Sequence, residues 1–222
     1  MADGVDPARL DLAVADFARL SDVADLARYA SRRYHRVDVL VNNAAVVGLG
    51  TRTVTIDGNE LTFQVNYLAP CLLTRLRAGS GRMIAVSSCL HRTVTIDWAD
   101  QQRRRSYCAA AAYAQSKLAL TMFTRALAQQ QLDITAVSVH PGIIDTQLLH
   151  LYGPRGVSAG AASPVVVRLC MPNTPFRNGA YYDGLTAVTP AALVTNDAAT
   201  MRLRGLTTNL LGQHRSPQTV AA

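Results

Sequence analysis

The sequence predicts an α/β fold built on a largely parallel sheet. Helix-like and strand-like segments alternate along the 222 residues, which is typical of parallel strands joined by helices. Three short apolar strands each stop at a polar or glycine-containing turn. Ligands of such sheets bind outside the carboxyl ends of the strands, so these turns mark the expected site.

The three strands and the helices between them follow from local patterns. The expected strands are 37–41, which ends at an Asn-Asn-Ala-Ala turn, 82–86, which ends at two serines, and 134–139, which ends at His-Pro-Gly. Residues 21–33 predict a helix with Ser21 as N-cap. The other expected helices are 58–75 and the alanine-rich segment 109–130. Residues 151–180 are rich in Gly, Pro, Ser and Asn, and we expect a substrate-side lid or a plain surface loop there.

Composition limits the class of protein. With 49% apolar and 17% charged residues, the chain can bury a core, and we expect one domain over residues 1–222. No run of 18 apolar residues exists, and the first residues lack the layout of a signal peptide, so no membrane span is expected. The four cysteines are scattered without metal-ligand spacing. They indicate buried thiols in a reducing compartment, no metal site, and a cytoplasmic protein.

The net charge of +7 raises the question of nucleic-acid binding. The arginines are spread along the chain, and the densest cluster, 103–105, has no stacking aromatic residues interleaved with it. We therefore expect a solvated loop there and no nucleic-acid partner. A positive field of this kind also favours an anionic cofactor.

The only lysine of the chain, Lys117, stands four residues after Tyr113 in the expected helix 109–130. Positions i and i+4 lie one above the other on a helix. An ammonium held there can lower the pKa of a phenol from about 10 toward neutrality, which makes the phenol a usable proton donor and acceptor. The alternative is compositional, because a chain that prefers arginine must place a lone lysine somewhere.

Five motifs in order resemble the short-chain dehydrogenase/reductase family. The residues around these motifs are similar to its retinol-dehydrogenase-like branch. The five motifs are NNAA (42–45), Asn66 in FQVNYLAP, the pair Ser87-Ser88, YAQSK (113–117) and HPGIIDT (140–146). The likeness extends over roughly residues 8 to 212. It implies a Rossmann-like, doubly wound parallel sheet, hydride transfer between NAD or NADP and a small apolar alcohol, aldehyde or ketone, and a possible homodimer.

The resemblance also implies roles for single residues. Tyr113 would be the general acid/base and Lys117 would assist it and hold the nicotinamide ribose, while Ser88 would bond the substrate oxygen. Asn66 would hold a water that links Lys117 to solvent. The further cofactor contacts would be Asp11 at the adenine, Asn42 and Ala44 at the adenosine, and Pro141, Gly142 and Thr146 at the nicotinamide.

Each of these residues also has a simpler explanation. Asn66 could bridge backbone groups, the two serines could be turn residues, and Thr146 could be a helix N-cap. Asp11 could be merely solvated. His91 and His140 lie near the site in sequence, but no acid and serine accompany them in a hydrolase pattern.

The sequence departs from the family at its front. Gly4 is the only glycine among the first 47 residues, so the glycine-rich turn that approaches a pyrophosphate is absent before NNAA. We expect a sheet that lacks its first two strands, or about 50 residues, and leaves strand 37–41 at an open edge. The segment RLRAGSG before strand 82–86 is also short, so the helix that carries Asn66 is expected to end early.

Two functions remain open. The first is an NAD(P)-dependent oxidoreductase. The alternative is an inactive, truncated fragment or pseudoenzyme of the same family that acts through subunit pairing.

Overall fold

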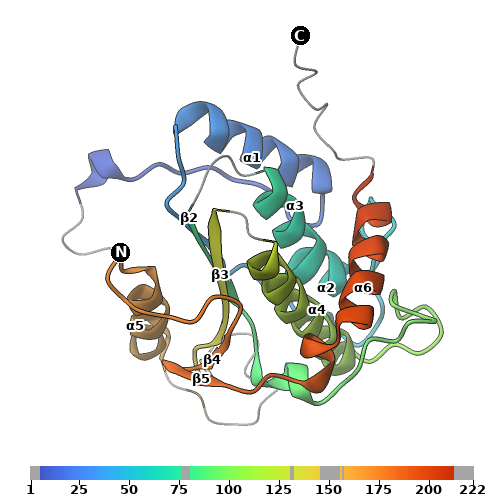
Figure 1. Cartoon of the computed structure of the whole chain (residues 1–222). Helices are drawn as coiled ribbons and strands as arrows, with labels where there is room; N and C mark the ends of the chain where they lie inside the picture. Colours follow the sequence, from blue (N-terminus) through green and yellow to red (C-terminus); the bar gives the residue numbers. More distant parts are fainter. Residues whose placement is uncertain (1–5, 77–80, 131–132, 146–155, 157, 213–222) are drawn as a thin grey trace.

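The computed structural model describes residues 6–76, 81–130, 133–145, 156 and 158–212, and it has an α/β fold (Figure 1). Five strands form one sheet in the order β1-β2-β3-β4-β5. The first four are parallel and the last is antiparallel to its neighbour. The strands are β1 (Val39–Asn42), β2 (Gly81–Val86), β3 (Ile134–His140), β4 (Tyr181–Asp183) and β5 (Thr186–Val188). The predicted fold class is thereby confirmed.

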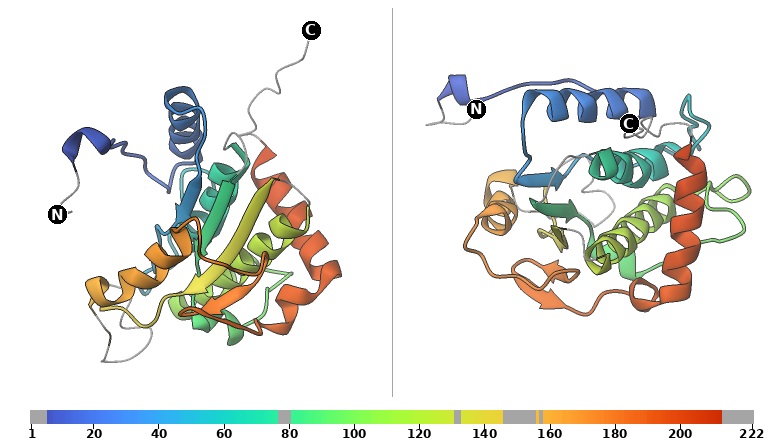
Figure 2. Two further views of the ribbon diagram at one scale, coloured as in Figure 1. Left: turned by 60° about the vertical axis from the view of Figure 1, so that its left-hand side comes forward. Right: turned by 45° about the horizontal axis from the view of Figure 1, so that its top comes forward.

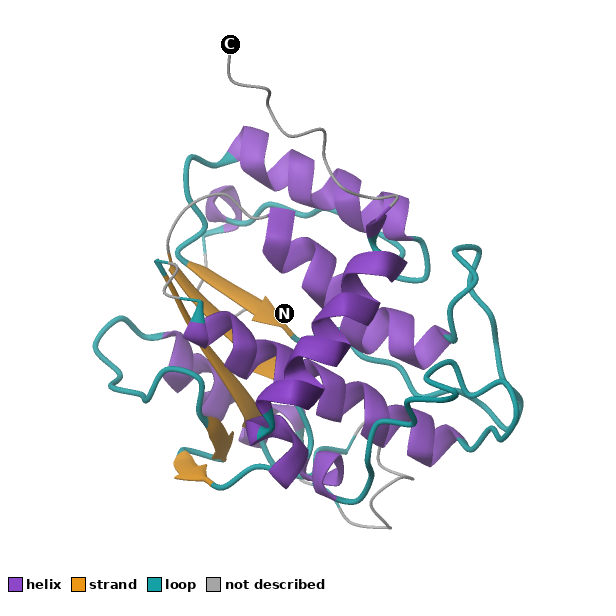
Figure 3. Cartoon of the chain, turned by 45° about the vertical axis from the view of Figure 1, so that its right-hand side comes forward, coloured by secondary structure: helices purple, strands orange, loops and turns teal. Residues whose placement is uncertain are grey.

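The helices cover the two faces of the sheet unequally (Figures 2 and 3). On one face lie α3 (Ala69–Leu76) and α4 (Ala109–Gln129). They are covered in turn by α1 (Leu20–Arg33) against α3 and by α6 (Asp197–Leu210) against α4. On the other face, α5 (Ala159–Cys170) packs against β2.

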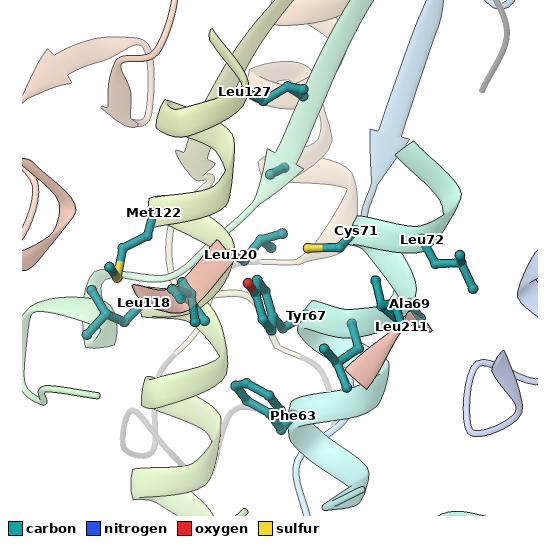
Figure 4. Packing of buried hydrophobic residues seen from close by; sticks show 14 of the residues in the cluster. Phe63, Tyr67, Ala69, Cys71, Leu72, Leu118, Leu120, Met122, Leu127 and Leu211 are labelled. Atoms are coloured by element: carbon teal, nitrogen blue, oxygen red, sulfur yellow. The ribbon is translucent and has the colours of Figure 1, made fainter. Parts of the chain in front are cut away.

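The larger core lies between the sheet and the α3–α4 layer. Phe63 and Tyr67 point from their helix toward α4, and they share one core cluster with Leu118 and Leu120 of α4 (Figure 4). Side chains of β2 alternate between the faces, so Met83 joins this core. A smaller core on the opposite face contains Ile84, Val137, Val139 and Leu169. The sheet is therefore buried on both sides, as a parallel sheet requires.

The prediction of Ser21 as N-cap of the first helix is wrong. Helix α1 begins one residue earlier, at Leu20, with Arg19 in the cap position and no capping bond from the Arg19 side chain. The backbone N–H of Leu20 instead donates to Asp57 Oδ2 at 2.9 Å. Leu20 is fully buried, so the core draws the helix start inward and a distant carboxylate satisfies its first donor.

The helix expected over 58–75 begins later and is interrupted. Glu60 accepts hydrogen bonds from the backbone N–H groups of Thr62 and Phe63, so the helix starts at α2 (Leu61–Phe63). A π-helical turn, η2 (Gln64–Leu68), follows and leads into α3. Asn66 sits in this turn, and such turns occur frequently at functional sites.

The segment 151–180, expected as a lid or loop, contains helix α5. Residues 151–155 and 157 lie outside the described residues. Although this segment is rich in glycine, serine and proline, Val165 and Leu169 form an i,i+4 pair that packs on the sheet. Burial of this pair outweighs the low helix propensity of the segment.

Strand β1 is the edge of the described sheet and pairs only with β2 there. Among the described residues before it, none belongs to a strand. Three apolar side chains of the extended segment 10–14 face solvent, with exposed fractions of 61% for Leu10, 87% for Leu12 and 93% for Val14. The expected open edge is therefore present in the described chain.

The capping bond from Asp57 predicts a measurable effect on stability. Asp57→Ala should lower the free energy of unfolding by about 1–2 kcal/mol, because Leu20 N–H loses a charged acceptor. Asp57 also accepts from Gln64 Nε2 at 2.8 Å. Urea unfolding would measure the change. Asp25→Ala, which removes an exposed ion pair with Arg28 on the same helix, is the control and should change stability by less than about 0.5 kcal/mol. An equal loss in both variants would contradict the capping role.

Candidate active site

The carboxyl ends of β1, β2 and β3 surround one cavity of about 550 Å³. This volume lies within the range of small-molecule and cofactor sites. The three turns that follow these strands in the sequence all contribute to its wall. The lining residues are Asn43, Ala44, Ala45, Val46, Val47, Val86, Ser87, Tyr113, Lys117, His140, Pro141, Gly142 and Ile144.

Tyr113 and Lys117 both face this cavity from one side of α4. The ammonium of Lys117 lies 5.6 Å from the centre of the Tyr113 ring and donates a hydrogen bond to the carbonyl oxygen of Val86 at 2.8 Å. Lys117 is only 2% exposed. Burial lowers its pKa from 10.5 to about 7, because the charged form loses its hydration. The cavity wall therefore contains the ammonium of Lys117 close to the phenol of Tyr113, and little water reaches the ammonium.

The two serines after β2 have different environments. Ser87 lines the cavity, but its hydroxyl bonds Thr121 Oγ1 at 2.7 Å and the carbonyl oxygen of Lys117 at 3.3 Å, both on α4. Ser88 is fully buried behind the lining. Its Oγ accepts from the backbone N–H of Leu90 at 3.0 Å and so caps the 3₁₀ turn η3 (Cys89–Arg92).

Asn66 ties the turn after β1 to α4. Its Oδ1 accepts from the N–H of Val46 at 2.8 Å, and its Nδ2 donates to the carbonyl of Val46 at 2.9 Å and to Ser116 Oγ at 3.0 Å. Ser116 lies between Tyr113 and Lys117 in the chain, so Asn66 fixes the helix turn that carries both. These bonds fit the backbone-bridging explanation, and its role in holding a water stays a prediction.

The structure brings some of the remaining expected residues to the cavity and not others. Ala44, Pro141 and Gly142 line it, and Gly142 has a φ of 106° with open space where a Cβ would be. Asn42 is buried outside the lining, where its Nδ2 donates to Thr74 Oγ1 at 3.1 Å. Thr146 lies outside the described residues.

Asp11 also lies outside the cavity lining. Its carboxylate accepts from Tyr34 at 2.7 Å and from Tyr29 at 2.9 Å, and it pairs with Arg33 at 3.3 Å. These hydrogen bonds, first of all the one from Tyr34, lower the pKa of Asp11. In this structure the carboxylate anchors the extended segment to α1, and its contact with an adenine stays a prediction.

Sequence reasoning did not assign Val46, Val47 or His140 to the site, although it placed His140 near the site in sequence and expected apolar residues around 143–151 beside the substrate. Val46, Val47 and Ile144 line the cavity, one or two residues after the NNAA and Pro-Gly turns in the sequence. His140 ends β3 and also lines it, and burial is the main cause that lowers its pKa. The signal for all four was their position one to three residues from a strand-end turn.

The arrangement suits proton transfer to or from a small apolar molecule. A phenol and a buried cation face an apolar wall, and the described residues include no cluster of three His, Cys, Asp or Glu that could hold a metal ion. Nor does any helix in the described ranges have the length and apolar character needed to cross a membrane.

Comparison with known proteins gives the family context of this geometry. A family model described as short chain dehydrogenase matches residues 5–154. Retinol dehydrogenase 13 of Mus musculus is 32% identical over an alignment of 231 residues. The match covers 91% of this chain and 69% of the relative. The crystal structure of a blue fluorescent protein from a metagenomic library, in complex with NADPH, is 30% identical with a TM-score of 0.57, and the match covers 78% and 74% of the two chains. An uncharacterized protein from Mycobacterium paratuberculosis shares the fold, with a TM-score of 0.75, 24% identity and coverage of 89% and 74%.

The buried ammonium predicts a pH-dependent stability difference. Below pH 7 the folded chain holds a charged Lys117 in a buried site, and this cost fades as the pH rises from about 7 to 10.5, above which the amine is neutral in both states. Lys117→Met should therefore raise the free energy of unfolding by on the order of 4 kcal/mol at pH 6 and by much less at pH 10.

Urea unfolding of both proteins at several pH values measures this difference. Arg28→Met, the same loss of a cation at an exposed position, is the control and should show no pH-dependent gain. If Lys117→Met changes the free energy of unfolding equally at all pH values, then burial does not destabilise the charged form of Lys117, and the prediction is wrong.

Proposed function

Since this chain belongs to the short-chain dehydrogenase family, we propose that it is an NAD(P)-dependent oxidoreductase that interconverts an alcohol and a carbonyl group. The observation that carries the proposal is the pair Tyr113–Lys117, one helical turn apart, facing a cavity at the carboxyl ends of parallel strands. A proton donor and a cation at that edge of an α/β sheet suit acid–base catalysis beside a bound nucleotide.

The cavity residues fit one half of the cofactor. Lys117 offers an ammonium to the ribose, and the backbone at Pro141 and Gly142, open at Gly142, leaves room for the flat nicotinamide ring. When bound, NAD or NADP would supply or accept the hydride. The remaining contacts of the proposal are Asn42 and Ala44 at the adenosine, Asp11 at the adenine and Thr146 at the carboxamide.

Tyr113 would move the proton that accompanies the hydride. In reduction its hydroxyl gives a proton to the substrate oxygen, and in oxidation its phenolate takes that proton back. A charged Lys117, whose ammonium lies 5.6 Å from the centre of the Tyr113 ring, would stabilise the phenolate. With a pKa of about 7, Lys117 is partly charged at neutral pH. Asn66 would hold the water through which Lys117 exchanges protons with solvent.

Ser88 would donate a hydrogen bond to the substrate oxygen and stabilise the charge that develops there. The support is the resemblance, in which the second serine of such a pair takes this role. The hydroxyl of Ser87, which lines the cavity, bonds α4. The backbone N–H of Leu90 donates to the Oγ of Ser88. Ser88 follows Ser87, which lines the cavity, in the sequence.

The substrate would be a small apolar alcohol, aldehyde or ketone. Val46, Val47 and Ile144 give the cavity an apolar wall, and segment 151–180, with α5, would cover its substrate side. The retinol in the name of the murine relative is an apolar alcohol of the same chemical kind. A reducing, cytoplasmic location is part of the same proposal. The expectation of buried thiols holds for Cys71 and is wrong for Cys108, which is exposed. A homodimer is part of the same proposal.

One observation favours a second candidate function. Strand β1 is an unpaired edge of the described sheet, and such an edge can pair with another chain. The chain would then be a pseudoenzyme or fragment that acts by pairing with another subunit.

Replacement of Tyr113 tests the proposed role. Tyr113→Phe should reduce turnover by about 10²–10⁴-fold, because the proton donor is lost while the ring and its packing stay. Steady-state kinetics and cofactor titration would measure the change, and the cofactor affinity should stay within about threefold of the original. An equal loss of turnover and cofactor binding would show that Tyr113 only shapes the site.

The two serines give a matched pair of variants. Ser88→Ala should lower kcat by about 10²–10³-fold, because a donor to the developing charge is lost. Ser87→Ala removes the bonds to α4 and should chiefly lower stability, with kcat less affected. Thermal unfolding and kinetics on both variants separate the effects. A larger kcat loss in Ser87→Ala would reverse the assignment.

A further inference from the structure

His91 is fully buried next to the proposed site, and none of the roles above uses it. Both of its ring nitrogens have partners. Nδ1 lies 2.7 Å from the carbonyl oxygen of Ser88, and Nε2 accepts a hydrogen bond from the backbone N–H of Ala191 at 3.1 Å. Ala191 lies 100 residues from His91 in the sequence, so the imidazole is a cross-link within the fold.

The chemistry of the two partners determines the form of the ring. A carbonyl oxygen only accepts, so Nδ1 must carry the proton, and a backbone N–H only donates, so Nε2 must be unprotonated. His91 is therefore the neutral Nδ1–H tautomer. Burial is the main cause that lowers its pKa to about 4. The hydrogen bond to the Ser88 carbonyl acts in the opposite direction, and the charges of Arg92 and His140 lower the pKa further.

The next residue strengthens the same cross-link. Arg92 donates to the carbonyl of Thr189 at 2.8 Å, and its guanidinium lies 5.0 Å from the ring centre of Tyr181. The imidazole of His91 lies 4.4 Å from that same ring. Tyr181 belongs to β4, and Thr189 and Ala191 lie in the connection from β5 to the 3₁₀ turn η5 (Ala192–Thr195). Turn η3 is thus joined to the C-terminal part of the sheet by two consecutive side chains.

This cross-link acts directly on Ser88. The carbonyl oxygen of Ser88 accepts from the backbone N–H of His91 at 3.2 Å as well as from the imidazole, and its Oγ accepts from Leu90 N–H. The peptide that follows Ser88 is therefore held by the His91 side chain. A small rotation of that peptide would move the Ser88 hydroxyl, and catalytic hydrogen bonds tolerate little misplacement.

We propose that His91 is a positioning residue, which holds the Ser88 hydroxyl in its orientation by linking the Ser88 carbonyl to the backbone of Ala191. The proposal deepens, and for its catalytic consequence rests on, the proposed oxidoreductase function. It also links the Val-Ser-Ser-x-x-His segment (86–91) to the Gly-Ala-Tyr-Tyr-Asp segment (179–183), because the ring of Tyr181 lies close to the side chains of both His91 and Arg92.

The first test needs no cofactor or substrate. In a ¹⁵N-labelled chain at pH 7, the imidazole of His91 should carry its proton on Nδ1. A proton on Nε2, or an imidazolium ion, would overturn the proposal, because either form is incompatible with the Ala191 bond.

The second test reads the position of the Ser88 hydroxyl through the amide of Leu90, which donates to it. In His91→Phe, which keeps an aromatic ring against Tyr181 but has no ring nitrogen, exchange of the Leu90 amide should become about tenfold faster or more. The amide of Thr62, bonded to Glu60 elsewhere in the fold, should not change. His35→Phe makes the same replacement at an exposed histidine and is the control. Unchanged Leu90 exchange would reduce His91 to a packing residue.

The third test asks whether His91 acts through Ser88. His91→Phe should lower kcat about tenfold while the KM for cofactor stays constant, and it should add nothing to the loss already caused by Ser88→Ala. His91→Asn, which keeps a donor near the Nδ1 position, should have an intermediate effect, and it decides the question if the Phe variant does not fold. A His91→Phe loss that persists in full beside Ser88→Ala would overturn the mechanism.

The outcomes separate this inference from the proposed function. If the unmodified chain has no turnover, the oxidoreductase proposal fails, while the tautomer and the Leu90 exchange still decide whether His91 positions Ser88.

Discussion

The buried ammonium of Lys117 is the constraint around which the cavity is built. An unpaired cation in an apolar interior is costly, and here its partners are one carbonyl at the end of β2 and the face of one aromatic ring. The lowered pKa of Lys117 records that cost. Groups whose pKa values are shifted by burial in a cavity are concentrated at functional sites. We therefore expect Lys117 to lower the stability of the fold while it assists proton transfer by Tyr113.

Polar bonds fix helix α4 relative to the turns that surround the cavity. Ser87 joins the end of β2 to α4 through Thr121, and Asn66 joins the turn after β1 to α4 through Ser116. These bonds are directional, whereas apolar packing alone would allow small rotations of the helix. Because of them, Tyr113 and Lys117 keep a set orientation toward the ends of three strands. The link from His91 to Ala191 extends the same arrangement to the C-terminal part of the sheet.

Local patterns predicted the parts of this molecule that depend on local interactions. The strands β2 and β3, helix α4 and the Tyr113–Lys117 pair were readable, since strand-end turns and i,i+4 spacing are encoded in neighbouring residues. The features that these patterns did not predict depend on long-range contacts. Asp57 caps a helix that begins 37 residues before it, and Tyr29 and Tyr34 determine where Asp11 lies. Helix α5 forms because Leu169 is buried against the sheet, a fact that the composition of its segment conceals.

The central claim is that the cavity beside Tyr113 and Lys117 holds a nicotinamide dinucleotide. Calorimetric titration of the purified 222-residue chain with NADPH and with NADH tests it most directly. The account predicts saturable binding of about one cofactor per chain, with the usual hyperbolic dependence on concentration. A folded chain that binds neither cofactor would contradict the claim and would favour the alternative of a pseudoenzyme or fragment.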